Sequence, residues 1–288
     1  MTIGVKLDIG FNHNDSYRSL FGTRDVLGLL TGLGVRAAET AVDLETDFAA
    51  LAEHISICSK AGLRVSLHPY TEGTLCNPAY FSKHDRHCRQ FHTRVFMAAE
   101  DAAVRQHRPA IVNIHGAAAE AGESRRALVD ESIRFFKWGR EWCAENAPHV
   151  TLVAELQFRP FPGESIQRIG DNYEELLEIA TGADVGVCLD LGHAYMNALR
   201  FHVPLDPPVE ILRRVAHVHC HDAGEIDHHP LVHDRVPCER VLAAAADCGF
   251  DGTVVLEVPA ASFLEAGGIE TLVQSIEKLK TFSAAASS

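Results

Sequence analysis

The sequence lacks the long apolar segments that mark membrane and secreted proteins. Its 288 residues contain no run approaching the ~18 uninterrupted apolar residues of a membrane span. The first ten residues, MTIGVKLDIG, show neither the basic segment nor the apolar core of a secretion signal. We therefore expect a cytoplasmic protein that makes no contact with a membrane.

Several cysteine and glycine motifs are also missing. None of the eight cysteines forms a C-x-x-C pair, which argues against a zinc ribbon and a dithiol redox centre and predicts reduced thiols. No G-x-G-x-x-G follows the first apolar run, and no G-x-x-x-x-G-K-[ST] occurs anywhere. The two common nucleotide-binding loops are therefore absent.

Positive charge is scarce, whereas histidine is abundant. Lys and Arg number 26 against 39 Asp and Glu, which gives a formal net charge of −13. This balance disfavours a protein that binds duplex nucleic acid mainly by neutralising phosphates, so a nucleic-acid partner is not our first expectation. The chain also holds 17 histidines. Carboxylates and imidazoles together are the side chains from which divalent metal sites are built.

Short apolar runs rich in Val, Ile and Leu recur along the whole chain, and each is followed by a stretch with helical spacing. The expected strands are Ile3–Ile9, Val35–Val42, Leu63–His68, Ala110–His115, Val150–Glu155, Val185–Asp190, Val215–His219 and Thr253–Glu257. The expected helices are Thr23–Leu33, Asp47–Ala61, Lys83–His107, Ser124–Asn146, Asn172–Thr181, Pro208–Arg214, Cys238–Cys248 and Gly268–Lys280.

Eight such units predict an α/β fold, a closed (β/α)₈ TIM barrel, with a doubly wound open sheet as the alternative. We expect one domain over residues 1–288, with a frayed tail at 280–288. Thr23, Asp47, Ser124 and Asn172 have side chains suited to cap helices. Gly62, Gly182 and Gly249 precede strands, where a left-handed residue would end the preceding helix.

Potential metal ligands end six consecutive predicted strands. In a (β/α)₈ barrel the carboxyl ends of all strands meet at the face that carries the active site. Residues that are far apart in sequence are therefore expected to converge there. Taken singly, each histidine could be a hydrogen-bonded core residue, and each glutamate could pair with Arg159 or Lys6. The six residues are His68, His115, Glu155, Asp190, His219 and Glu257.

Two local motifs add candidates. In CLDLGHAYMN, Asp190 and His193 stand three residues apart, so a carboxylate at a strand end and an imidazole from the next loop can reach one site. The segment AHVHCHDAGEIDHHPLVHDRVP holds six histidines. Within it we expect His217 to lie deeper in the barrel than His219, Asp227 and His229 to act as ligands from a loop, and Asp222 to support them. His228, His233 and Asp234 are interpreted as solvated loop residues.

These motifs, LHPY, VNIHG, AELQ, VCLDLGHA, HVHCHDA, DHHPL and VVLEV, resemble the xylose-isomerase-like TIM barrels between Leu63 and Glu257. That superfamily includes sugar isomerases and epimerases as well as endonuclease IV. The isomerase pattern implies one metal on Glu155, Asp190, His219 and Glu257, with both glutamates transferring protons. The endonuclease IV pattern implies a trinuclear zinc site on His68, His115, Glu155, Asp190, His193, His219, Asp227, His229 and Glu257.

The resemblance implies a metal-dependent sugar isomerase or epimerase that moves a proton next to a metal-chelated carbonyl of a small polyhydroxylated substrate. Glu155, Glu257 and His193 are the expected catalytic residues, with His193 bonded to a substrate oxygen. The cofactor would be Mn²⁺, Zn²⁺ or Mg²⁺, at one to three ions per chain. The alternative is an endonuclease IV-like zinc phosphodiesterase, a hydrolase with two or three ions. Barrels of this type often pair, so a homodimer is a further expectation.

Overall fold

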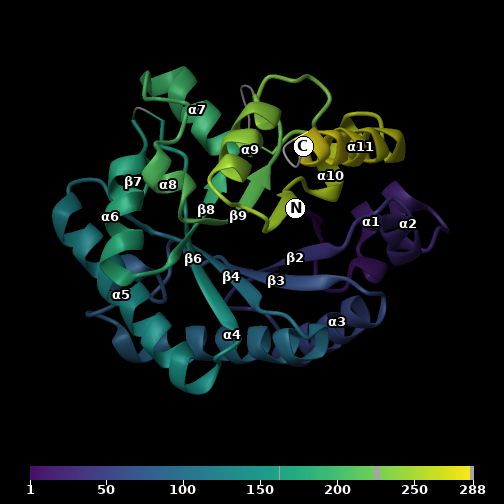
Figure 1. The fold of residues 1–288 in the computed structure, drawn as a ribbon. Helices are drawn as coiled ribbons and strands as arrows, with labels where there is room; N and C mark the ends of the chain where they lie inside the picture. Colours follow the sequence, from purple (N-terminus) through teal and green to yellow (C-terminus); the bar gives the residue numbers. More distant parts are fainter. Residues whose placement is uncertain (162, 224–227, 286–288) are drawn as a thin grey trace.

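Eight parallel strands close into a barrel in the computed structural model, which describes residues 1–161, 163–223 and 228–285 (Figure 1). The order of neighbouring strands is β1-β10-β9-β8-β6-β4-β3-β2, and the register is parallel throughout. The expected (β/α)₈ barrel is therefore confirmed. The strands are β1 Thr2–Lys6, β2 Ala37–Val42, β3 Arg64–Pro69, β4 Ala110–His115, β6 Val150–Glu155, β8 Gly186–Asp190, β9 Val215–Cys220 and β10 Thr253–Leu256.

Helices surround these strands on the outside (Figure 1). Each predicted helix has a counterpart, because each carries an apolar stripe that packs on the barrel. They are α2 Val26–Gly32, α3 Phe48–Lys60, α4 Asp85–Gln106, α5 Arg125–Asn146, α6 Tyr173–Ala183, α8 Val209–Leu212, α9 Cys238–Asp247 and α11 Ile269–Ala285. The last one continues beyond Lys280, so the helix does not end where the tail was predicted to begin.

The capping predictions hold for three helices and fail for one. Asp47, Ser124 and Asn172 each accept a hydrogen bond from a backbone amide in the first turn. Thr23 caps nothing, since α2 begins three residues later. Gly62 and Gly249 adopt positive φ as expected, but Gly182 lies inside α6 and Asp184 takes the left-handed position instead, at a φ of 55°.

Several short elements at the ends of the strands were not predicted. They include the helices α1 Asp15–Phe21, α7 Leu191–Phe201 and α10 Ala260–Glu265, and the 3₁₀ turns η1 Phe11–His13 and η2 Pro78–Tyr80. Two more strands, β5 Ala117–Glu120 and β7 Ile166–Ile169, form a separate antiparallel pair. Apart from α7, which has 11 residues, these segments are too short to show a clear hydrophobic period, so tertiary contacts decide their conformation.

The β5–β7 pair begins directly after the end of β4. Gly116 joins β4 to β5, and a Cβ at this position would overlap the carbonyl oxygen of Ile169. Glycine therefore allows the two backbones to approach closely. As a result, β5 and β7 form a wall beside the carboxyl end of β4, where His115 lies.

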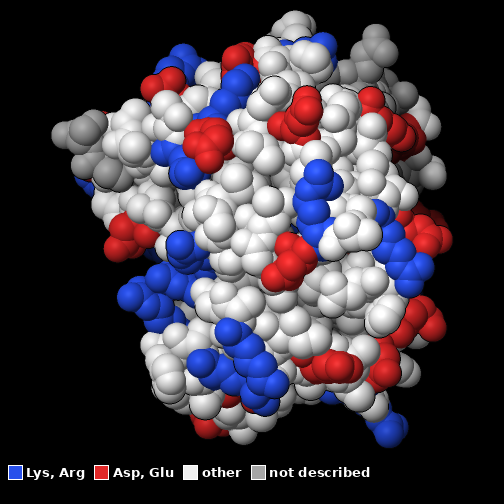
Figure 2. All heavy atoms as spheres, turned by 90° about the vertical axis from the view of Figure 1, so that its right-hand side faces the viewer, with Lys and Arg blue, Asp and Glu red and all other residues white. Residues whose placement is uncertain are grey.

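The thiols agree with the expectation from the cysteine pattern. All eight cysteines are unpaired, and seven of them are buried. Acidic and basic side chains are interspersed over the face drawn in Figure 2. Across the described ranges, no helix combines the length and the apolar character that a bilayer crossing demands.

Two buried histidines outside the barrel mouth predict a loss of stability in acid. Burial lowers the pKa of His54 and of His92 from 6.5 to about 4. The unfolded chain therefore binds protons between pH 6.5 and 4 that the folded chain does not, so stability falls as the pH falls through this window. For His92 the loss amounts to about 3 kcal/mol.

Urea unfolding at pH 7.5 and at pH 4.5 checks this prediction. We expect His92→Phe to make stability depend less on pH than in the parent protein, because no imidazole remains to be protonated at that position. The exposed His13 offers the matched control, and His13→Gln should leave the pH dependence unchanged. Equal pH dependence in the parent and His92→Phe proteins would contradict the assignment.

Candidate metal centre

Four of the predicted ligands meet inside the barrel at the carboxyl ends of adjacent strands. Glu155 ends β6, Asp190 ends β8, His219 is the penultimate residue of β9, and Glu257 follows β10. One ligand atom from each lies within 4.8 Å of one from every other member. All four side chains are at most 2% exposed. We call these four residues the central cluster.

His219 is the hub of the central cluster. Its Nδ1 lies 2.8 Å from Glu257 Oε2, 3.5 Å from Asp190 Oδ2 and 3.8 Å from Glu155 Oε1. The register explains part of this arrangement, because Asp190 is paired directly with His219 across β8 and β9. One imidazole nitrogen thus faces three carboxylates that come from three different strands.

A second group shares Glu155 with the central cluster. His68 Nε2 lies 3.3 Å from Glu155 Oε2, and His115 Nε2 lies 3.6 Å from Glu155 Oε1. The other ring nitrogen of His68, Nδ1, donates to the Asn113 carbonyl at 2.9 Å. That bond directs His68 Nε2 towards the carboxylate. His68, His115 and Glu155 have the geometry of a possible second metal site.

The third group differs from the prediction. His193 Nδ1 lies 3.4 Å from Asp190 Oδ2, but the imidazoles that gather near His193 are those of His221 and His228. His228 Nε2 also lies 3.4 Å from Glu257 Oε2, so this residue belongs to the site and is not simply a solvated loop residue. The rings of His221 and His228 are stacked, with centroids 4.6 Å apart.

His229 and Asp227 are the two ligands that were predicted from the loop after β9. The backbone of His229 pairs with that of Asp222, with N–O distances of 2.8 and 2.9 Å. Among the described residues His229 joins none of the three groups, and its neighbour His228 occupies the place expected for it. The predicted ligand Asp227 lies outside the described residues. Asp222 supports the loop as expected, because its carboxylate accepts backbone amides of His233 and Val236.

Asp190 also organises the start of α7. Its Oδ1 accepts the His193 backbone N–H at 2.7 Å, which caps the helix and brings His193 to the site. The same oxygen lies 3.1 Å from His221 Nε2. Asp190 therefore holds two of the imidazoles in place besides being a candidate ligand.

Two polar groups contact the outer oxygen of Glu257. The Tyr70 hydroxyl donates to Glu257 Oε1 at 2.9 Å, and Lys6 Nζ lies 3.5 Å from the same oxygen. Of the two ion-pair partners suggested by the sequence, Lys6 is therefore the one that lies beside Glu257. Arg159 instead pairs with Asp171 at 3.2 Å, outside the central cluster. Tyr70 follows the LHP motif directly, but no local pattern reveals that its hydroxyl reaches Glu257, since the two residues are 187 positions apart.

Two more polar side chains in the barrel were missed from the sequence. Glu39 lies in the middle of β2, buried to 2% exposure, with its carboxylate against His217 and His219. Asn113 on β4 donates its side-chain amide to Glu155. A charged residue within an apolar run, as in AAETAV, is the only signal that could have indicated Glu39.

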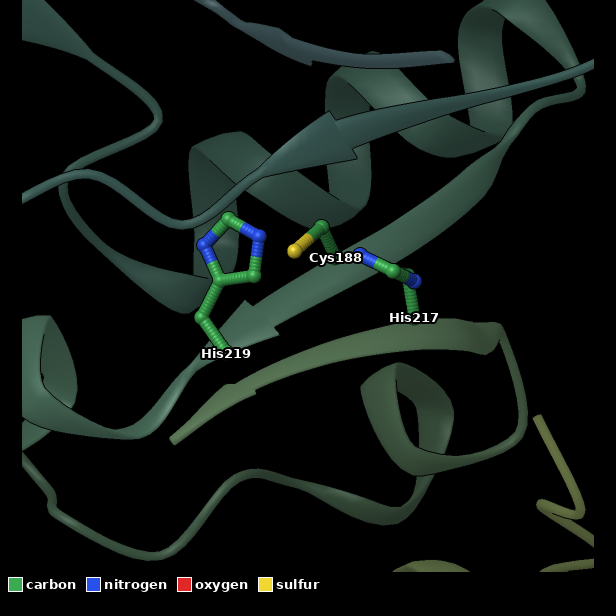
Figure 3. A group of neighbouring side chains, drawn as sticks. All are labelled: Cys188, His217 and His219. Atoms are coloured by element: carbon green, nitrogen blue, oxygen red, sulfur yellow. The ribbon is translucent and has the colours of Figure 1, made fainter. Parts of the chain in front are cut away.

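Deeper in the barrel, side chains of β8 and β9 lie next to the central cluster. Figure 3 shows the Cys188 sulfur on β8 lying between the imidazoles of His219 and His217 on β9. Cys188, His217 and His219 form a compact buried set. His217 thus lies deeper than His219, as the alternation along the strand predicted.

The carboxylates of the centre are held in their ionised form. Burial disfavours ionisation of Glu155, but His115 and His68 outweigh it and lower its pKa to about 2. The same opposition lowers the pKa of Asp190 through His193 and His221, and that of Glu257 through His219 and His228, well below the ordinary values. Burial alone would lower the pKa of His219, but Cys188 and the surrounding carboxylates raise it well above 6.5.

Several buried atoms at the centre have no hydrogen-bond partner of suitable geometry among the described residues. They are His68 Nε2, Glu155 Oε1 and His219 Nδ1. Buried polar atoms are nearly always satisfied, so these three atoms indicate that the centre can take up a further group. Three carboxylates and one imidazole are a donor set that suits a hard or borderline divalent cation. The residues therefore fit a metal ion.

Comparison with known proteins agrees with the barrel. The model of the xylose isomerase-like TIM barrel family matches residues 29–282. No curated protein sequence matches the chain significantly.

Solved structures with the same fold include a D-tagatose 3-epimerase-like protein, which is 19% identical with a TM-score of 0.68 over 100% of this chain and 98% of that one. A D-psicose 3-epimerase from Clostridium cellulolyticum, solved with D-tagatose, is 15% identical with a TM-score of 0.68, over 99% and 98%. The IolI protein with a bound zinc atom is 14% identical with a TM-score of 0.58, over 99% and 98%. At these identities the likeness establishes the fold alone.

Proposed function

Because the chain belongs to the xylose isomerase-like TIM barrel family, we propose that it is a divalent-metal-dependent isomerase or epimerase of a small polyhydroxylated carbonyl compound. The observation that carries the proposal is the convergence of Glu155, Asp190, His219 and Glu257 at the carboxyl end of the barrel. Two of the solved structures with the same fold are described as a sugar epimerase and an epimerase-like protein, which supports this class of reaction.

The central cluster would hold the ion. When bound there, a divalent cation would polarise the substrate carbonyl and so acidify the neighbouring C–H bond. His219 Nδ1 and Glu155 Oε1, which are buried without a hydrogen-bond partner among the described residues, would be satisfied by such an ion. Mn²⁺ suits three carboxylates and one imidazole, and Zn²⁺ and Mg²⁺ are the other candidates.

Proton transfer falls to the two glutamates. Glu257 is ionised, as a base must be, and its Oε1 is positioned by the Tyr70 hydroxyl and Lys6. Glu155 is ionised as well, and Asn113 fixes its Oε2. One glutamate would take the proton next to the carbonyl and so become a carboxylic acid. A proton would then return to the same or the adjacent carbon from that acid, or from the other glutamate after it has taken up a proton from solvent. Return to the opposite face of the same carbon gives an epimer, whereas return to the adjacent carbon gives an isomer.

The remaining groups at the mouth suit a polyol. His193 is held by Asp190 and by a 2.9 Å bond from its Nδ1 to the Leu156 carbonyl, so its ring has a fixed orientation. Phe158 packs against this ring with centroids 5.3 Å apart. A fixed imidazole beside an aromatic face can hydrogen-bond a hydroxyl group while it contacts the carbon chain. We propose that His193 binds a substrate oxygen.

Exchange of a carbon-bound proton tests this proposal. The Mn²⁺-loaded protein should incorporate deuterium from D₂O next to the carbonyl of at least one ketose or aldose in a panel of neutral and phosphorylated sugars, as seen by NMR. Removal of the metal with a chelator should stop the exchange. If a protein with bound Mn²⁺ exchanges no proton in any member of the panel, the proposal fails.

Phosphodiester hydrolysis is the second candidate, because His68 and His115 approach Glu155 in a way that suits a second ion. The group of His193, His221 and His228 could hold a third. With two or three ions, one would generate hydroxide and the others would stabilise the leaving oxygen. The net charge of −13 disfavours a nucleic-acid substrate. Turnover of a simple aryl phosphodiester by the zinc-loaded protein would favour this candidate.

His68→Ala separates the two candidates. An isomerase that needs only the central cluster should keep one ion per chain and retain turnover after this change, because the four central ligands remain. A phosphodiesterase should lose an ion, and metal analysis should show a fall from two or three ions per chain. His87→Ala, on the exposed side of α4, is the control and should change neither quantity.

A further inference from the structure

Glu39 spans the barrel beneath the central cluster. It lies on β2, while His217 and His219 lie on β9, a strand that is not its neighbour in the barrel. Glu39 Oε1 lies 2.6 Å from His219 Nε2, and Glu39 Oε2 lies 2.7 Å from His217 Nε2. The Ser66 hydroxyl donates to Oε2 at 3.1 Å. One carboxylate thus faces two imidazoles and one hydroxyl group.

The environment of Glu39 is dry. The exposed fractions are 2% for Glu39, 6% for Ser66, and 0% for both histidines. A carboxylate in such a place costs several kcal/mol in lost hydration unless other groups compensate it. A structural role for the barrel alone would be met more cheaply by an apolar residue, which is what usually fills this layer. The position of Glu39 therefore indicates a task directed at the histidines.

The contact with Glu39 determines which nitrogen of His219 is available. Nε2 lies 2.6 Å from Glu39 Oε1, the separation of an ion pair, and we assign a proton to that nitrogen. Nδ1 is then the atom that faces Glu257, Asp190 and Glu155. Metal-bound histidines typically donate their second N–H to a carboxylate, which fixes the tautomer and raises the basicity of the ligand nitrogen.

We propose that Glu39 is a positioning residue that orients His219 so that its Nδ1 binds the divalent cation of the central cluster. The inference rests on the metal dependence of the proposed function. His217 and Ser66 complete the arrangement, since they hold Glu39 Oε2 while Oε1 meets His219. In Figure 3 the Cys188 sulfur lies between the rings of His217 and His219, so this side chain also neighbours His219.

Glu39→Gln is the direct test. The amide has nearly the same shape but carries no charge and offers only one oxygen, so it cannot serve both imidazoles as an acceptor. We expect the Mn²⁺ dissociation constant, measured by calorimetry on the folded protein, to rise by about 10- to 100-fold. In ¹⁵N-histidine NMR spectra of the Zn²⁺-loaded protein, the His219 signals should also change from those of a ring protonated at Nε2 alone.

Asp171→Asn is the matched control. Asp171 is also a buried carboxylate, at 1% exposure, and it pairs with Arg125 and Arg159 outside the central cluster. This variant should lose stability but keep the Mn²⁺ affinity of the parent. If Glu39→Gln binds Mn²⁺ as tightly as the parent, or if Asp171→Asn weakens binding equally, the inference is wrong.

A milder change covers the case in which Glu39→Gln does not fold. Ser66→Ala removes only the hydroxyl group that holds Glu39 Oε2. It should weaken Mn²⁺ binding in the same direction by a smaller factor, and unchanged affinity would count against the inference. Failure of the parent protein to bind any divalent ion would overturn the proposed function itself. The two failures are therefore distinguishable.

Discussion

Glu257→Gln should lower the turnover of the Mn²⁺-loaded protein by about 10²- to 10⁴-fold, the usual contribution of a positioned acid or base. The amide keeps the shape of the side chain, and it can still accept a hydrogen bond from Tyr70, which contacts Oε1 at 2.9 Å. It cannot take up a proton from carbon. The steady-state rate on the substrate found by deuterium exchange is the measurement.

The fold and the ion must survive for this result to be decisive. Circular dichroism should show an unchanged barrel, and metal analysis should show that the ion remains, because three of the four central ligands are intact. Glu265→Gln, at the exposed end of α10, should leave turnover at the level of the parent. Full turnover in a metal-loaded Glu257→Gln protein would remove the proton-transfer role from this residue.

Gly192→Ala should disrupt the site although it adds only a methyl group. Gly192 lies in the first turn of α7, between Asp190 and His193, and a Cβ there would overlap the ring of His221. His221 would have to leave its position 3.1 Å from Asp190 Oδ1. Overpacking of this kind costs about 1–3 kcal/mol, and it would also displace the Asp190 carboxylate from the central cluster. We expect lower thermal stability and weaker Mn²⁺ binding.

Gly32→Ala is the matched control for this prediction. Gly32 is also helical, in α2, but no atom lies within 4 Å of the position that a Cβ would take. The same substitution should therefore leave Mn²⁺ binding unchanged and stabilise the helix by up to about 1 kcal/mol. Thermal unfolding and calorimetry of both variants provide the comparison. A Gly192→Ala protein with the stability and affinity of the parent would show that His221 adapts without cost.

The candidate ligands differ in how far the sequence reveals them. Glu155, Asp190, His219 and Glu257 could be identified from sequence because each ends or follows an apolar run, and the ends of parallel strands must meet on one face of a barrel. The same reasoning found His68 and His115. It needed only the position of each residue within its own strand.

The loop after β9 could not be read in this way. His228 and His229 are neighbours in sequence, but the backbone of His229 pairs with Asp222 while the side chain of His228 reaches Glu257. Loop conformation depends on a few hydrogen bonds to residues elsewhere, for which the local sequence carries little signal. The choice of His228 over His229 among the described residues is therefore a result of tertiary structure.

The sequence by itself determined the barrel and the four strand-end residues that meet in its central cluster, because hydrophobic period and strand ends are local properties of the chain. Only the tertiary structure decided what surrounds those ligands. The contact between Glu39 and His217 joins residues 178 positions apart, and that between Tyr70 and Glu257 joins residues 187 apart. Such contacts exist because the sheet closes on itself, which brings side chains from separate strands into one buried layer.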